Sequence, residues 1–201
     1  GVVFAEDLPR PFRPRHRLAA VLGELTRDLP VLAREAVRGV GAAWGREEHR
    51  ADVLVFDVGA SRPGKPYATG IRNCVALAVQ PGTGDLWCTV NERDGLGDYL
   101  VPDYSTRVRE GGFYGWPWYY MGDKEDPRHA GARPDLKGKT LTPDVPYEAH
   151  SAAVGFAFYT ATSGRSAFPA EYVGGAFALF HGSWNPADRT RHKVVRVPVQ
   201  N

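Results

Sequence analysis

Residues 75–90 read VALAVQPGTGDLWCTV and hold two short apolar runs on either side of a turn. The runs at 75–79 and 86–90 contain valine, threonine and tryptophan, which favour strands. The residues between them include PGTG at 81–84, which are of the types that close a tight connection between two strands. This stretch predicts a β-hairpin, and the rest of the chain can be interpreted outward from it.

Further strand-like runs lie on both sides of the hairpin and predict an all-β domain. They are found at 51–58, 104–109, 154–159, 175–181 and 193–199. Residues 111–149 are rich in glycine, proline and aromatic residues, and we interpret them as a long surface excursion.

A faint internal repeat connects these runs. The hairpin at 75–90 is followed by a polar loop at 91–98, and a second strand–turn–strand unit at 154–181 is followed by a polar loop at 182–188. Repeats of ~40–50 residues with several strands each are typical of β-propellers. The sequence therefore predicts a partial β-propeller over residues 51–201, with a β-sandwich as the structural alternative.

Residues 1–50 differ from the rest and are interpreted as a separate, atypical N-terminal segment. They contain arginine but no lysine, and three prolines within residues 9–14 predict an irregular start. A helical spacing follows in Leu18, Val21, Leu22, Leu25 and Leu29. We expect one short helix there and a second over 32–40, so that the N-terminal segment is irregular or partly helical.

The composition fits a packed domain and excludes some classes of partner. The chain has 201 residues, 43% hydrophobic and 24% charged, with a net charge of +2. Such a small net charge gives no reason to expect nucleic acid or an anionic membrane as a partner. No apolar run approaches the ~20 residues that a membrane helix needs, so we expect no membrane span.

Cys74 and Cys88 are the only cysteines, and they lie on the two strands of the predicted hairpin. If Gln80 pairs with Asp85, Cys88 lies opposite Leu77 and the two sulfurs lie on opposite faces of the sheet. That register predicts two free, buried thiols, although a β-bulge would change it.

Five motifs follow one another in the order typical of a known family. They are GIRN at 70–73, VNERDGLGD at 90–98, GGFYGWP at 111–117, HSA at 150–152 and HGSWN at 181–185. Together they resemble the pyrroloquinoline-quinone (PQQ)-dependent sugar dehydrogenases of the glucose/sorbosone and pyranose dehydrogenase type. The resemblance covers roughly residues 50–199.

The resemblance implies a six-bladed propeller with PQQ lying flat over one end of the central channel, together with Ca²⁺. It also implies oxidation of a sugar or polyol, and a periplasmic or secreted location. Six blades of ~40–50 residues need more than 201 residues. We therefore expect the chain to be a fragment with three or four blades' worth of sequence, the missing blades preceding Gly1.

The cofactor would need cations, amide donors and a flat wall, because PQQ carries three carboxylates and an ortho-quinone. Arg72 and Asn73 match the family's cofactor-binding pair. Trp184 is a candidate to stack on the quinone, and Asn185 and His181 lie on the same strand end. The alternative interpretations are a surface arginine with a turn asparagine, and a tryptophan packed between blades.

Hydride transfer from a hydroxyl-bearing carbon needs a base for the hydroxyl proton, and histidine suits that role. His150 is the candidate because it enters a strand in the region that lines the family's active site. A hydrogen-bonded structural histidine is the alternative. In the soluble glucose dehydrogenase branch the base comes from an early blade, which we expect to be absent from this chain.

Acidic and aromatic clusters complete the candidate residues. Carboxylates in a glycine-rich loop suit Ca²⁺, and the resemblance assigns Glu92 and Asp98 to a structural calcium ion; Asp94 and Asp103 lie in the same stretch. An aromatic cluster is formed by Tyr114, Trp116, Trp118, Tyr119 and Tyr120. We interpret it as a loop pinned down by its own rings, with sugar stacking as the alternative.

The leading hypothesis is therefore a PQQ-dependent oxidoreductase that acts on a sugar or polyol. The second is a truncated propeller without catalysis, serving at most as a binding module. The third is a Ca²⁺-dependent, lactonase-like propeller hydrolase, which would need carboxylates from several blades around one metal ion.

Overall fold

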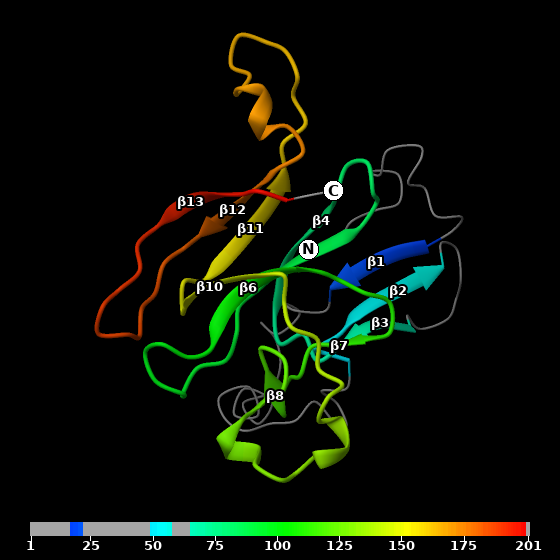
Figure 1. Ribbon diagram of the computed structural model, residues 1–201, viewed down its shortest axis with the longest axis vertical. Helices are drawn as coiled ribbons and strands as arrows, with labels where there is room; N and C mark the ends of the chain where they lie inside the picture. Colours follow the sequence, from blue (N-terminus) through cyan, green and yellow to red (C-terminus); the bar gives the residue numbers. More distant parts are fainter. Residues whose placement is uncertain (1–16, 22–48, 58–64, 200–201) are drawn as a thin grey trace, which may run out of the picture.

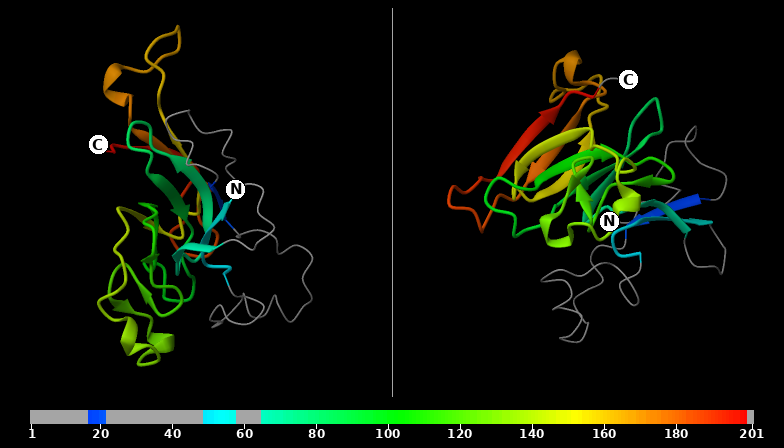
Figure 2. Two further views of the ribbon diagram at one scale, coloured as in Figure 1. Left: turned by 90° about the vertical axis from the view of Figure 1, so that its right-hand side faces the viewer. Right: turned by 60° about the horizontal axis from the view of Figure 1, so that its bottom comes forward.

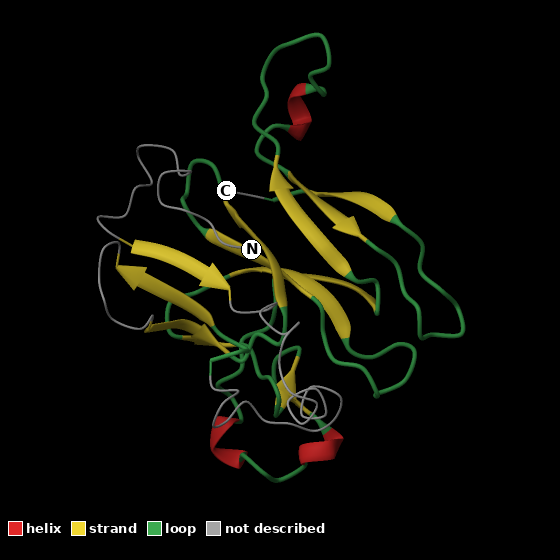
Figure 3. Ribbon diagram, turned by 180° about the vertical axis from the view of Figure 1, so that it is seen from behind, coloured by secondary structure: helices red, strands yellow, loops and turns green. Residues whose placement is uncertain are grey.

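The computed structural model describes residues 17–21, 49–57 and 65–199, with the backbone alone for 17–21 (Figure 1). Its regular structure is mostly strands: β1 Arg17–Val21, β2 Val53–Asp57, β3 Lys65–Thr69, β4 Cys74–Val79, β5 Leu86–Val90, β6 Pro102–Arg107, β7 Gly112–Phe113, β8 Tyr119–Tyr120, β9 Lys124–Glu125, β10 Val145–Ala149, β11 Ala153–Phe158, β12 Ala176–Phe180 and β13 Lys193–Val197. The described helical turns, red in Figure 3, are 3-10 turns at Pro127–His129, Pro134–Leu136 and Ala170–Tyr172. The expectation of an all-β domain is confirmed.

Three larger sheets make up the described fold. The central sheet has the order β10-β6-β5-β4, the second sheet β1-β2-β3-β7 and the third sheet β11-β12-β13, while β8 and β9 form a separate small hairpin. The second and third sheets lie on opposite sides of the central one in Figure 1, and the right-hand view of Figure 2 shows the same order. The described residues form no closed ring of sheets.

Two apolar cores hold the sheets together. One contains Val53 and Ile71 beside Val90 and Tyr104 of the central sheet, all almost completely buried. The other contains Trp87 of the central sheet, which stacks on Phe156 of the third sheet with ring centroids 5.6 Å apart. The central sheet therefore has a core on each face, and the two cores position the loops at its ends.

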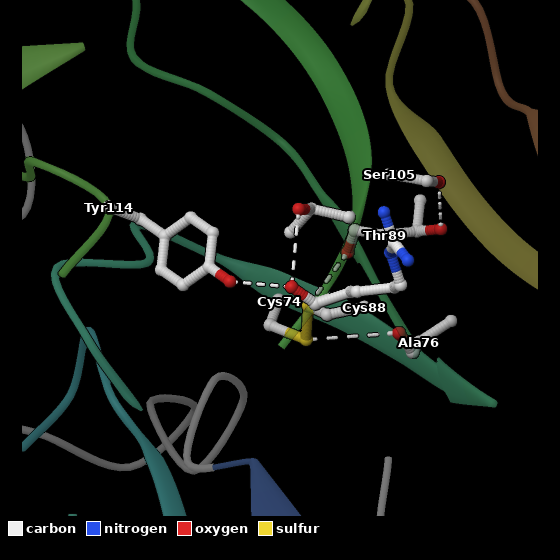
Figure 4. Close-up of a disulfide and its surroundings, with 8 residues drawn as sticks. Cys74, Ala76, Cys88, Thr89, Ser105 and Tyr114 are labelled. Atoms are coloured by element: carbon white, nitrogen blue, oxygen red, sulfur yellow. Dashed lines mark hydrogen bonds between the residues drawn. A yellow bond between two sulfur atoms is a disulfide. The ribbon is translucent and has the colours of Figure 1, made fainter. Parts of the chain in front are cut away.

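The hairpin that the sequence predicts is present, but its cysteines are not free. Gln80 N donates to the carbonyl of Asp85 at 2.8 Å, and Leu77 pairs with Cys88 as expected. A bulge between residues 74 and 76 then places Cys74 opposite Val90, on the same face as Cys88. The two cysteines form a disulfide with their Cα atoms 5.8 Å apart (Figure 4). The prediction of free thiols is wrong because this bulge changes the register.

The expected N-terminal helix begins where the structure has a strand. Residues 17–21 form β1, which pairs antiparallel with β2 from Arg17 opposite Asp57 to Val21 opposite Val53. Backbone pairing with a neighbouring strand here overrides a helical spacing that was weak in itself. The remainder of that helix and the second one, over 32–40, lie outside the described residues.

Residues 111–149 are not only a surface excursion. Their last part forms β10, which pairs with β6 and becomes the edge of the central sheet, with Val145 opposite Ser105. Their first part is pinned by its own rings, as expected, because Tyr114, Tyr119 and Tyr120 are buried. These rings cannot serve as an open platform for sugar stacking.

No helix among the described residues has the length and apolar character required to cross a membrane.

Candidate functional site

Four loop segments leave the central and third sheets at the same end of their strands. Cys74 pairs with Val90 at this end of the central sheet, and Ala153 pairs with Phe180 at the corresponding end of the third sheet. The segments that continue beyond these pairs are 70–73, 91–101, 150–152 and 181–192. We call this set of segments the site edge. It carries every residue that the sequence analysis assigns to a cofactor, a metal ion or a base.

Hydrogen bonds tie the segments of the site edge to one another. The amide of Asn91 donates to the carbonyl of Asn73 at 3.0 Å, and the amide of His181 donates to the carbonyl of Ala152 at 2.9 Å. The amide of Ala152 in turn donates to a carboxylate oxygen of Asp103 on β6 at 2.7 Å. Hydrogen bonds therefore connect the segments of the site edge within the central sheet, within the third sheet and between the two.

His150 and Asn185 meet at this edge, and Asp94 joins them. The Oδ1 atom of Asp94 lies 3.0 Å from Nδ1 of His150 and accepts a hydrogen bond from Nδ2 of Asn185, also at 3.0 Å. The other ring nitrogen of His150, Nε2, lies 2.9 Å from the carbonyl oxygen of Gly97. Two residues predicted from separate motifs are thus in direct contact, since Asn185 Nδ2 is 3.3 Å from His150 Nδ1.

The surroundings of the His150 ring limit what it can do chemically. A carbonyl oxygen only accepts, so Nε2 carries a hydrogen that it donates to Gly97. Nδ1 is then the one ring position where a proton can be gained or lost, and it faces Asp94 and Asn185. The role of His150 as a base stays a prediction, and it would have to act through Nδ1.

Residues 150–152 form a strained turn that Asp103 holds in place. His150 and Ala152 both have positive φ, at 60° and 52°, which is uncommon for residues other than glycine. The Asp103 carboxylate accepts from the hydroxyl of Ser151 and from the amides of Ala152 and Glu92. Burial raises the pKa of Asp103 from its ordinary value, outweighing the hydrogen bonds that lower it.

Arg72 lies half-buried at the start of the central sheet, next to the loop at 91–98, which we call the acidic loop. Its Nη1 donates to the carbonyl of Asn91 at 3.1 Å, and its guanidinium lies 5.7 Å from the ring centre of Trp116. The neighbouring Oδ1 of Asn91 is buried and has no hydrogen-bond partner among the described residues. A buried acceptor without a donor is unusual and is consistent with a place for a ligand or an ordered water molecule.

Trp184 and His181 occupy exposed positions on the loop after β12. The side chain of Trp184 is 77% exposed, so it is not packed between sheets of this chain. His181 contacts the ring of His192, with centroids 5.0 Å apart. Among the described residues, no hydrogen bond connects either of them to His150 or Arg72.

The acidic loop is folded around its own partners. Glu92 is buried and its Oε2 accepts from the Nε of Arg93 at 3.0 Å, while Asp98 accepts from the amide of Ala187 at 3.1 Å. In the part of the chain that the structure describes, no group of three or more His, Cys, Asp or Glu side chains could hold a metal ion. The assignment of Glu92 and Asp98 to calcium stays a prediction without a carboxylate cluster to support it.

The sequence analysis missed Arg93, which is the largest fully buried side chain among the described residues. Its guanidinium pairs with Glu92 and with Oδ2 of Asp126, and it donates to the carbonyls of Pro117 and Tyr119. The rings of Trp116 and Tyr120 flank it at 4.8 and 5.4 Å. Arg93 therefore fastens the acidic loop to the aromatic segment at 114–120.

Asp126 and Arg128 extend this connection to Asp94. Arg128 donates through Nε and Nη2 to the carboxylate of Asp126, and through Nη1 to the carbonyl of Asp94 at 3.0 Å. Burial favours the neutral acid, but the hydrogen bonds from Arg128 and Arg93 outweigh it and lower the pKa of Asp126 to about 2. No local sequence signal marks the connection, because Arg93 and Asp94 lie more than 30 residues before Asp126 and Arg128.

Comparison with protein families gives one match that covers most of the described sheets. The model described as Glucose / Sorbosone dehydrogenase matches residues 58–179. A protein of Borreliella burgdorferi, described as "Uncharacterized protein", is 28% identical over 137 residues, which are 67% of this chain and 34% of that protein.

Similar solved structures share the fold at low sequence identity. A Trichoderma reesei protein of carbohydrate-active enzyme family AA12 matches with a TM-score of 0.65 and 17% identity, over 99% of this chain and 52% of that one. The PQQ domain of pyranose dehydrogenase from Coprinopsis cinerea gives 0.63 and 19%, over 92% and 50%. The soluble aldose sugar dehydrogenase of Escherichia coli gives 0.57 and 18%, over 97% and 53%. The chain spans about half the length of these solved relatives.

Proposed function

Because the chain belongs to the glucose/sorbosone dehydrogenase family, we propose that its site edge binds PQQ and serves the oxidation of a sugar or polyol. The observation that carries the proposal is the convergence of separate motifs on one edge. His150 and Asn185 are in direct contact there, and Arg72 is fixed to the adjacent loop. A solved relative from Coprinopsis cinerea is itself described as a PQQ domain.

We propose that the three sheets are three blades of the six-bladed propeller that the family resemblance implies, and that residues 51–201 form this domain, with 1–50 as an atypical segment. The order of the sheets supports this, because each packs its face against the next around the central one. The far side of the third sheet exposes Val154, Leu179 and Val194. Exposed apolar side chains on one sheet are consistent with further protein covering it.

Several residues of the site edge fit the chemistry of PQQ. Arg72 offers a fixed cation to a carboxylate, because one nitrogen is already held by Asn91 and the ring of Trp116 lies beside it. Trp184 presents an exposed indole face on which a planar ring could stack. Asn185 and His181, in the segment at 181–192, and Asn73, in the segment at 70–73, offer polar groups. When bound, PQQ would supply a quinone that accepts a hydride from the hydroxyl-bearing carbon of the sugar.

His150 would take the proton of that hydroxyl through Nδ1. The carboxylate of Asp94 lies 3.0 Å from this nitrogen and would be close to the hydroxyl that binds there. Asn185 would have to yield its contact with Nδ1 when substrate enters. The ring itself is already oriented, because its Nε2 donates to the carbonyl of Gly97.

Calcium and location are further parts of the proposal. One structure of the Trichoderma reesei relative is described as a calcium structure. We keep Glu92 and Asp98 as the proposed calcium ligands, although Glu92 would then have to share its carboxylate with Arg93. We derive no catalytic step from the ion. The buried disulfide between Cys74 and Cys88 supports a periplasmic or secreted location, because disulfides persist in oxidising compartments.

Turnover is tested by adding PQQ and Ca²⁺ to the purified chain and following dye reduction with a panel of aldoses and polyols. We expect sugar-dependent reduction, lowered by about tenfold or more in Arg72→Ala, because a charge-assisted hydrogen bond contributes roughly 1.5–3 kcal/mol. Arg165→Ala is the matched control, since Arg165 is exposed in the loop that joins the other ends of β11 and β12.

Two results would count against this activity. Equal loss in the Arg72 and Arg165 variants would show that the arginine at the site edge has no special role. PQQ binding without turnover would instead favour the second candidate function, a propeller portion that binds the cofactor without catalysis. The length of the chain, about half that of its solved relatives, favours this alternative.

A further inference from the structure

We propose that Asp94 is the positioning residue of the site edge, holding His150 and Asn185 as one hydrogen-bonded unit, and that Arg128 anchors Asp94 through its backbone carbonyl. The inference rests on the proposed function only where it says that this unit serves a cofactor site. Its geometry is a property of the chain by itself. Neither residue belongs to the set of cofactor, base and metal ligands described above.

The side chain of Asp94 joins two segments that are far apart in the sequence. A single oxygen, Oδ1, receives Nδ2 of Asn185 and faces Nδ1 of His150, each at 3.0 Å. The His150 side chain is only 5% exposed, whereas that of Asp94 is 54% exposed. The carboxylate therefore caps a buried ring from the solvent side and determines which way its Nδ1 points.

The backbone of Asp94 is held independently. Arg128 Nη1 donates to its carbonyl at 3.0 Å, and the same guanidinium is fixed by two bonds to Asp126. The next residue is Gly95, with φ of 85°, where an added Cβ would lie 3.3 Å from Nη1 of Arg128. A glycine at this place therefore leaves room for the arginine to cross the loop and reach the Asp94 carbonyl.

The two contacts together predict what the unit does. With Nε2 bonded to Gly97, the Asp94 carboxylate fixes the remaining nitrogen of His150 toward Asn185. It also fixes the amide of Asn185, whose nitrogen faces Asp94 so that its carbonyl oxygen points the other way. Asp94 thus sets the orientation of the His150 ring and of the Asn185 amide before any ligand binds.

The test is the ¹⁵N NMR signature of the His150 ring in the chain without cofactor. In Asp94→Ala we expect the Nδ1 resonance of His150 to move while the other five of the six histidines keep theirs. Asp94→Asn should retain most of the wild-type signature, because its amide oxygen still accepts from Nδ2 of Asn185 and so leaves Asn185 in place beside Nδ1. Asp188→Ala is the control, since Asp188 is an exposed aspartate on the neighbouring loop.

Arg128→Ala is expected to broaden or shift the same resonance by a smaller amount. Arg133→Ala is its control, because Arg133 also pairs with an aspartate two residues away, the exposed Asp135, but does not contact the acidic loop. Each variant is first checked for cooperative unfolding in urea, because Arg128→Ala also removes a partner of the buried Asp126, while Asp94 is exposed enough that its replacement should not unfold the chain.

The outcomes separate this inference from the proposed function. An unchanged His150 signature in a folded Asp94→Ala variant overturns the positioning role, whatever PQQ does. A changed signature that Asp94→Asn restores supports it, even if the chain binds no PQQ. If PQQ does bind, its affinity should fall at least about threefold in Asp94→Ala, which corresponds to the loss of a modest hydrogen bond. The affinity should stay unchanged in Asp188→Ala.

Discussion

Replacing Arg93 with alanine is expected to lower the free energy of unfolding by about 3–5 kcal/mol, the cost of breaking a buried ion pair. The guanidinium is 1% exposed and bonds two carboxylates, of Glu92 and Asp126, and two backbone carbonyls. Its removal leaves Glu92 buried without its cation, while Asp126 keeps only Arg128. Urea unfolding followed by tryptophan fluorescence measures the change.

Two further variants sharpen this result. Arg93→Lys should recover only a small part of the loss, because an ammonium group cannot reproduce the planar set of hydrogen bonds. Arg133→Ala removes an exposed pair with Asp135 and should leave the unfolding free energy almost unchanged. An Arg93→Ala variant as stable as Arg133→Ala would show that the buried network does not hold the acidic loop.

Removal of the Cys74–Cys88 disulfide is expected to cost about 3 kcal/mol, the loop-closure value for a cross-link of this span. The double variant Cys74→Ala/Cys88→Ala should therefore unfold at a lower urea concentration than the oxidised protein. Both cysteines are buried in the core between the second and central sheets, so the small side chains also lose some packing.

The oxidation state is checked separately. A thiol assay on the denatured, unreduced protein should find no free thiols, and reduction should release both. Addition of reductant should destabilise the wild-type chain and leave the double variant unaffected. Two free thiols in protein purified under oxidising conditions would contradict the bond itself.

The parts of the fold that sequence predicted well are those set by local patterns. The hairpin around residues 81–84 forms with the expected pairing of Gln80 and Asp85, because turn chemistry and strand alternation act over a few residues. The disulfide was missed because it depends on a bulge that local alternation does not reveal. Strand β1 was missed because its partner, β2, lies more than 30 residues away.

The candidate site shows the same division. Family motifs placed His150 and Asn185 near the cofactor, and the structure has them in contact, which is a finding about geometry and leaves their roles as predictions. Arg93 lies beside a glutamate in a glycine-rich loop, and such a position is ordinarily solvated. Its burial depends on Asp126, 33 residues later, which no local pattern indicates.

The site edge is supported by a continuous series of contacts that begins in the two cores. The two cores fix the ends of the sheets, and the pair of Arg93 and Asp126 fixes the acidic loop. Asp94, which belongs to that loop, in turn contacts His150. Rigid support of this kind is what a cofactor site needs, because small misplacements of its contacting groups are costly.

The most direct test of the central claim is an equilibrium dialysis of the purified chain against PQQ, with and without Ca²⁺. We predict saturable binding of one PQQ per chain, weakened about tenfold or more by Arg72→Ala and by Trp184→Ala, and unchanged by Arg165→Ala. Absence of saturable binding, or equal affinity in all four proteins, would contradict the assignment of the site edge to this cofactor.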